Sequence, residues 1–169
     1  MNQINTLIEE QIPRLRRYAR ALVRDRARAD DLVQDTLERA WEKRQLWRPE
    51  SDIRAWMFTI MHNVFVNQLK QSQSTKAFVS MEDEEHEIPV RATQDDDLEM
   101  RDLLSAIGRL PDEFKEVVLL VGLEQLRYEE VANVLDVPIG TVMSRLSRGR
   151  EKLRALMSGI PSPTLRRVK

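Results

Sequence analysis

Apolar residues recur along most of this chain at the spacing of an amphipathic helix, and this period restricts the fold more than any other feature. The clearest case is residues 27–43, where the i, i+3, i+4 rule is kept by Ala29, Leu32, Val33, Thr36, Leu37, Ala40 and Trp41. The chain also has only 5 glycines and 5% aromatic residues, with 33% charged residues. This mixture favours helices over sheets, so we predict an all-α fold.

The same period predicts helices in both halves of the chain. Besides 27–43, they cover residues 4–24, 53 to about 71, 97 to about 108, 111 onward, 128–135 and 139–157. Pro13 can divide or kink the first helix, because proline lacks the backbone donor that a helix interior uses. Ser51 or Asp52 can cap the helix that follows them. Pro111 suits a first helical position.

One polar stretch separates the two sets of helices. Residues 72–96 have no apolar period and are rich first in Gln, Ser and Thr and then in acids. Such a composition cannot bury enough apolar surface to fold by itself, which indicates a solvated linker. We therefore predict two small helical domains joined by an acidic linker, with these bounds: domain over 1–72, linker over 73–96, domain over 97–160 and tail over 161–169.

The net charge of −1 conceals an uneven distribution. Residues 82–102 are strongly acidic, whereas residues 139–169 are strongly basic. Basic clusters attract polyanions, so the nearly neutral total does not argue against nucleic-acid binding.

Several classes of site are excluded by composition. Without cysteine, the chain can form neither disulfides nor thiolate metal sites. His62 and His86 have no second ligand at a suitable spacing, so we predict no metal and no cofactor. We find no catalytic arrangement and no glycine-rich phosphate loop, and we expect a non-enzyme. No segment approaches the roughly 20 apolar residues of a membrane span, so we expect a cytoplasmic protein that does not insert into a membrane.

Residues 128–157 have the pattern of a helix-turn-helix. The sequence Asp136-Val137-Pro138 breaks the first helix, and Ala132 is small where two helices must approach closely. The residues expected to face inward are Leu135, Val137, Val142, Leu146, Leu153 and Leu156. The opposite face of the second helix carries Thr141, Arg145, Arg148 and Lys152. A basic face of this kind suits the major groove, although an ordinary hairpin with a solvated basic face would share it.

An acidic stripe follows one face of the 27–43 helix. It consists of Asp31, Asp35, Glu38 and Glu42, with Gln34 beside it. Like charges at this spacing repel each other by about a few tenths of a kcal/mol per pair, and a basic partner would relieve that repulsion. A simple solvated face remains the alternative.

Two further features lie between these motifs. Trp47 occupies a polar loop, where it can fold back on the core or form a wall for an unstacked base. The next helix carries Thr59, Asn63, Asn67 and Lys70 on one face. Asparagine can bind a base edge and lysine a phosphate, but an ordinary surface would also suit these residues. Trp56 is interpreted as a core residue.

Two groups of motifs resemble a known family. The strings Ala29–Thr36 and Ala55–Asn63 resemble region 2 of the extracytoplasmic-function (ECF) sigma factors of bacterial RNA polymerase. Leu110-Pro111 resembles the start of their region 4, and Gly140–Arg150 resembles its recognition helix. The order of the motifs, with a polar linker between them, makes the resemblance more specific than either motif alone.

The resemblance implies a protein that binds core polymerase and directs initiation at particular promoters. The clamp helices of the largest subunit would bind Asp31, Gln34, Asp35 and Glu38, and the flap of the second subunit is a further expected partner. The −10 element would contact Trp47, Arg48, Ser51, Asn63, Asn67 and Lys70. The −35 element would contact Thr141, Ser144, Arg145, Ser147, Arg148 and Lys152. The resemblance also implies an anti-sigma factor as a partner, and it implies that the protein has no active site of its own.

The sequence departs from the family in its recognition helix, and it leaves other functions open. Met143 and Ser147 occupy positions where some members carry Arg and an aromatic residue, so the preferred −35 sequence cannot be inferred. One alternative is a stand-alone helix-turn-helix regulator whose first half dimerises or senses a ligand. Another is a mimic that sequesters an inhibitor of sigma, which would need neither Arg145 nor Arg148.

Overall fold

The computed structural model describes residues 3–76 and 95–159, and side chains are described for 3–73 and 99–159. The described residues form seven α-helices and one 3₁₀ turn, in agreement with the predicted all-α fold. Their bounds are α1 Gln3–Leu22, α2 Arg26–Lys43, η1 Arg44–Leu46, α3 Ile53–Lys76, α4 Asp95–Gly108, α5 Asp112–Gly122, α6 Tyr128–Leu135 and α7 Ile139–Met157. No helix among these residues is long and apolar enough to cross a membrane.

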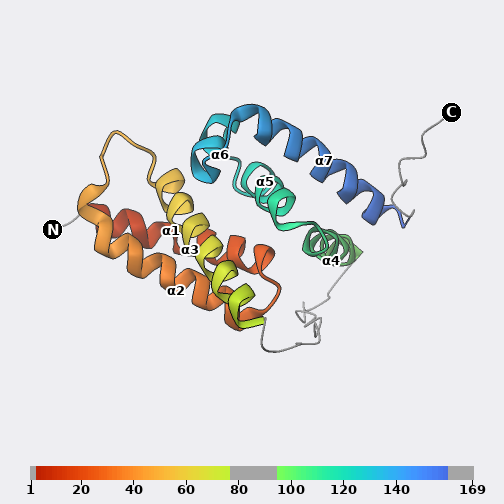
Figure 1. Cartoon of the computed structure of the whole chain (residues 1–169), viewed down its shortest axis with the longest axis horizontal. Helices are drawn as coiled ribbons and strands as arrows, with labels where there is room; N and C mark the ends of the chain where they lie inside the picture. Colours follow the sequence, from red (N-terminus) through yellow and green to blue (C-terminus); the bar gives the residue numbers. More distant parts are fainter. Residues whose placement is uncertain (1–2, 77–94, 160–169) are drawn as a thin grey trace.

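Helices α1, α2 and α3 form the first bundle (Figure 1). Its core contains Leu15 and Leu32, both fully buried, and Phe58 and Met61 from α3. The rings of Tyr18 and Phe58 meet edge to face with their centroids 5.0 Å apart. Such pairs add to the stabilisation from apolar burial and orient α3 on α1.

Helices α4 to α7 form the second bundle (Figure 1). Val117, Leu120, Val131 and Val142 are almost completely buried and join α5, α6 and α7. Helix α5 is buried over most of its length, with α7 on one side and α1 on the other. It is therefore the central element of this half.

The two bundles pack against each other, with α3 against α6 and α1 against α4 and α5. Most buried apolar residues of the two halves belong to one continuous core. Polar contacts also cross this seam. Arg17 Nη2 donates to Glu124 Oε1 at 3.2 Å, and Arg54 Nη1 donates to the carbonyl oxygen of Glu124 at 3.1 Å. The imidazole Nδ1 of His62 and Oε1 of Glu116 lie 2.6 Å apart.

Charged groups are unusually common at this seam. Of the four buried polar residues described, Lys115, Glu116 and Glu124 all come from the second half and face the first. The fourth, Thr36, donates within its own helix to Leu32 O at 2.7 Å. Burial, together with the carboxylates of Glu116 and Glu124, raises the pKa of Tyr18. The seam therefore joins the halves partly through desolvated charges.

The helix boundaries agree with the sequence in most places. Helix α1 continues through Pro13 without a break, and α3 extends past the predicted end near Gln71 to Lys76. Asp52, rather than Ser51, caps α3, because its Oδ1 accepts from the Arg54 backbone N–H at 2.9 Å. The interior of the predicted linker, the tail and His86 lie outside the described residues.

Glu124 provides a test of the seam. Burial raises the pKa of its carboxyl group, although the hydrogen bond and charge of Arg17 oppose the shift. The folded protein therefore binds this proton more tightly than the unfolded chain does, and stability decreases as pH rises from about 4.3, the ordinary glutamate value, through the raised pKa. Glu124→Gln removes this dependence. Urea unfolding between pH 4 and 8 should show the wild type losing stability relative to the variant as pH rises. If the difference in unfolding free energy between the wild type and Glu124→Gln does not change with pH, the raised pKa of Glu124 is contradicted.

Candidate nucleic-acid interface

Helices α6 and α7 form the predicted helix-turn-helix with the predicted bounds. Between them Asp136 adopts a left-handed conformation, with φ of 54°, and its neighbour Val137 donates from its backbone N–H to Ala132 O at 3.1 Å. Asparagine and aspartate tolerate this conformation better than most residues do. Pro138 is the N-cap of α7, which begins at Ile139. The turn thus fixes the angle between the two helices.

The inward face of α7 agrees with the prediction except at its end. Val142 and Leu146 are buried, and Leu153 packs against the core. Leu156, however, is 36% exposed, so the prediction that it points inward was wrong. By then α7 has passed beyond α6, and the apolar period continues where fewer neighbours remain to cover it.

A close approach of α7 to α5 places the recognition helix. A Cβ atom added at Gly149 would lie 2.8 Å from Cγ2 of Val118, so only glycine fits without movement. In contrast, a Cβ at Gly140, on the outer side of the same helix, would meet nothing within 4 Å. Gly149 therefore sets how deeply α7 sits on the second bundle.

The predicted basic face lies toward α5 rather than fully outward. Arg145 Nη2 is 3.9 Å from Glu113 Oε2, and the Arg145 side chain is only 28% exposed. The ammonium group of Lys152 lies 5.1 Å from the centre of the Phe114 ring. Arg148, Ser144 and Ser147 are exposed, and Thr141 is half-buried. Arg148 is consequently the most accessible arginine of the predicted set.

Sequence reasoning missed an exposed apolar pair at the start of α7. Ile139 is 42% exposed and Met143 is 53% exposed. They are four residues apart and therefore share one side of the helix. The apolar period of a helix does not predict which large apolar side chains are exposed. It gives the spacing of the residues but not the neighbours that cover each of them.

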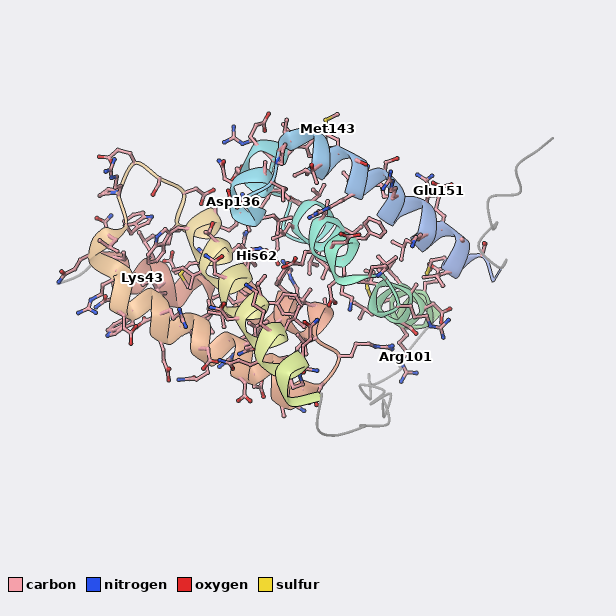
Figure 2. All side chains as sticks on the ribbon, viewed as in Figure 1. Lys43, His62, Arg101, Asp136, Met143 and Glu151 are labelled. Atoms are coloured by element: carbon pink, nitrogen blue, oxygen red, sulfur yellow. The ribbon has the colours of Figure 1, made fainter. Side chains whose placement is uncertain are left out.

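The predicted −10 face of α3 is open to solvent at the residues that could bind DNA. Asn63, Asn67 and Lys70 are exposed. Thr59 is partly buried, and its Oγ1 donates to Ala55 O at 2.9 Å, so its hydroxyl is already used within the helix. His62, the neighbour of Asn63, points toward α5 and the seam (Figure 2). The seam therefore leaves the asparagine face free.

The loop before α3 is folded upon itself. Ser51 donates from its hydroxyl to Arg48 O at 2.7 Å and from its backbone N–H to the same oxygen at 2.9 Å. Arg48 and Ser51 are exposed, whereas Trp47 is half-buried. The indole Nε1 of Trp47 is buried and has no hydrogen-bond partner among the described residues. The ring is therefore partly packed on the protein and partly accessible.

The acidic stripe lies on the outer surface of α2. Asp31, Gln34, Asp35 and Glu38 are all exposed. The Gln68 side chain of α3 donates to Asp35 Oδ2 at 2.8 Å, which holds that carboxylate in place. Four predicted residues therefore share one accessible surface.

A groove of about 420 Å³ lies beside this stripe, between α1 and α2. Its lining is Ile8, Glu9, Ile12, Gln34, Leu37, Glu38, Trp41 and Glu42. Trp41 belongs to the apolar period of its helix, yet it is 44% exposed and its ring stacks under the Arg44 guanidinium at 4.9 Å. The groove has an apolar floor and an acidic rim, and the sequence did not reveal it.

Comparison with known proteins agrees with this geometry. A model of the Sigma2 domain of PhyR matches residues 8–62, and a model of sigma-70 region 4 matches residues 100–153. The ECF RNA polymerase sigma factor EcfG of Rhodopseudomonas palustris (strain TIE-1) is 35% identical over 150 residues, covering 86% of this chain and 80% of that protein. This chain belongs to the ECF RNA polymerase sigma factors. The resemblance stated from the sequence is thereby confirmed.

Two solved structures have a similar arrangement of helices. The sigma factor RpoE of Bartonella quintana, in complex with the anti-sigma factor NepR, superposes with a TM-score of 0.79 at 30% identity, covering 94% of this chain and 98% of that one. CnrH, in complex with the cytosolic domain of CnrY, has a TM-score of 0.65 at 26% identity, covering 94% and 90%. Both superpositions span regions 2 and 4, so the likeness includes both bundles of this sigma factor.

The two glycines of α7 provide a matched test of the recognition-helix position. Gly149→Ala should destabilise this sigma factor, because overpacking of a buried contact costs about 1–3 kcal/mol. Gly140→Ala should be neutral or stabilising by up to about 1 kcal/mol, since alanine favours a helix and the site is open. Thermal unfolding of both variants measures the difference. Equal melting temperatures would show that α7 does not sit closely on Val118.

Proposed function

We propose that this ECF sigma factor directs initiation with three surfaces: α2 binds core polymerase, α3 and the loop before it bind the −10 element, and α7 binds the −35 element. The observation that carries this proposal is the accessibility of the predicted residues. The acidic stripe, the asparagine face and Arg148 are all exposed although the two bundles are packed together. Each surface can therefore meet a partner without unfolding of its bundle.

The surface for polymerase combines charge with an apolar groove. An amphipathic helix with apolar anchors and basic flanks suits such a groove, since helix-in-groove binding uses residues one turn apart. Leu37 and Trp41 supply the apolar floor, and Glu38 and Glu42 supply the acidic rim. We assign this surface to the clamp helices of the largest subunit, and region 4 to the flap of the second.

The promoter surfaces have different chemistry. On α3, amide groups of Asn63 and Asn67 can bind base edges, and Lys70 can bind a phosphate. The half-buried Trp47 in the adjacent loop provides an aromatic surface for an unstacked base, which is worth about 1–3 kcal/mol. Trapping such a base favours strand opening. The chain supplies binding only, and the polymerase performs the chemistry.

An anti-sigma partner is part of the proposal. RpoE and CnrH, which this chain resembles over both bundles, were solved with NepR and with the cytosolic domain of CnrY. We infer an inhibitor of this general kind that contacts both halves. Because its polymerase and promoter partners are in the bacterial cytoplasm, the protein is assigned to that compartment.

Asp31→Lys tests the polymerase surface. Reversing one charge on the stripe should weaken binding of core polymerase, because the expected partner is basic, and should leave the melting temperature unchanged. Fluorescence anisotropy with labelled sigma factor and core enzyme measures the affinity. Glu10→Lys, an exposed glutamate of α1 outside the groove, is the matched control. Equal affinities for the wild type and Asp31→Lys would contradict the assignment of the stripe.

Arg148→Ala tests the −35 surface. Loss of one arginine that binds a base should weaken promoter binding by about 1–3 kcal/mol, while core binding is retained. Arg16→Ala, an exposed arginine of α1, is the control. Gel-shift titration of holoenzyme on promoter DNA gives the difference. If Arg148→Ala binds the promoter as tightly as the control does, Arg148 does not contribute to the −35 interface.

The central experiment is transcription of a genomic library by homologous core polymerase, with and without this protein, followed by mapping of RNA 5′ ends. New start sites that share −35 and −10 elements are expected. An absence of new starts with duplex binding retained would favour the stand-alone regulator. Loss of both activities, with binding of an inhibitor, would favour the sequestering mimic.

A further inference from the structure

The recognition helix exposes large apolar side chains at the end that would enter DNA. Met143 is 53% exposed and Ile139 is 42% exposed, both within the first two turns of α7. Met143 lies at the outer edge of the molecule, away from the first bundle (Figure 2). Neighbours among the described residues therefore cover only part of each side chain and leave the rest in contact with water.

The outer surface of α7 is divided into three bands by the 100° rotation per residue of an α-helix. Arg145 and Arg148 form a basic band on the side of α5. Ser144 and Ser147 form a central band of short polar side chains, with open space at Gly140. Ile139 and Met143 form an apolar band on the far side over the first two turns, and exposed Arg150 and Arg154 continue that side further along α7.

The basic band alone does not account for recognition along the whole face. Arg145 is partly occupied by Glu113, and Lys152 lies over the Phe114 ring. Both side chains lean away from the apolar band. On the other side of the helix, a base that lies at the first two turns, before Arg150, meets Met143, which has neither a charge for phosphate nor a donor for a base edge.

One group in the major groove suits such a side chain. Thymine is distinguished there by its C5-methyl group, which proteins recognise through apolar contact. Methionine is unbranched and polarizable and fills irregular apolar surfaces. We propose that Met143 contacts the C5-methyl group of a thymine in the −35 element and makes recognition at that base pair depend on the methyl group. This inference rests on the proposed entry of α7 into the major groove.

The test removes only the methyl group from the DNA. Duplexes that the full-length protein retains from a random pool are resynthesised with uracil in place of thymine, one position at a time. At one position, wild-type affinity should decrease about fourfold, the value expected for one buried methyl group. In Met143→Ala the same replacement should have no effect, because the contact is already absent.

Met157→Ala is the matched control. Met157 is 42% exposed and lies at the other end of the same helix, beyond the turn that would enter the groove. This variant should keep the fourfold uracil effect. Salt dependence gives a second readout: Met143→Ala should leave the slope of affinity against salt unchanged, because the methionine side chain releases no counterion from phosphate.

Two results would overturn the inference. Either no thymine is sensitive to uracil, or the sensitivity persists in Met143→Ala. If Met143→Ala instead loses binding of core polymerase or of an anti-sigma protein, the apolar band serves a protein contact. Because the scan uses the full chain on duplex DNA, it gives a result even if the transcription experiment fails. The two failures can therefore be distinguished.

Discussion

The seam between the two bundles determines which surfaces of this sigma factor are accessible. Glu124 is its central group: its carboxylate accepts from Arg17, its backbone carbonyl accepts from Arg54, and the side chain is fully buried. Nearby, His62 turns from α3 toward Glu116 and leaves Asn63 outside. The same packing that buries the charges therefore orients α3 and α7 so that their candidate DNA-binding faces remain exposed.

The surfaces are sorted by chemistry as well as by position. Helix α2 presents carboxylates around an apolar groove, whereas α7 presents arginine, serine and methionine in adjacent bands. An acidic surface disfavours DNA and a basic one disfavours a basic polymerase helix. With the proposed assignment of partners, each surface disfavours the partner of the other, and this selectivity requires no change in the fold.

Local features of the sequence predicted the helices, but they could not predict the seam. The predicted bounds of α6 and α7 agree with the structure because Asp136 and Pro138 determine the conformation of the backbone next to them. Trp41 and Leu156 follow the apolar period yet are exposed, since burial depends on the neighbour that covers a residue. The partners Arg17 and Glu124 are 107 residues apart, and no spacing rule connects them. For the candidate site, the sequence predicted which residues would bind a partner. The groove and the apolar band were found only in the structure, because both depend on how the helices pack.

Oε2 of Glu124 is buried with no hydrogen-bond partner in the described part of the chain, which affects how the halves associate. A buried carboxylate oxygen without a partner favours release to water, so the seam is weaker than an apolar contact of equal size would be. Two separate proteins would gain little from such a contact. Here both halves belong to one chain, which keeps each at a high effective concentration near the other. Covalent connection thus keeps the halves packed through a contact that is weaker than an apolar one of equal size.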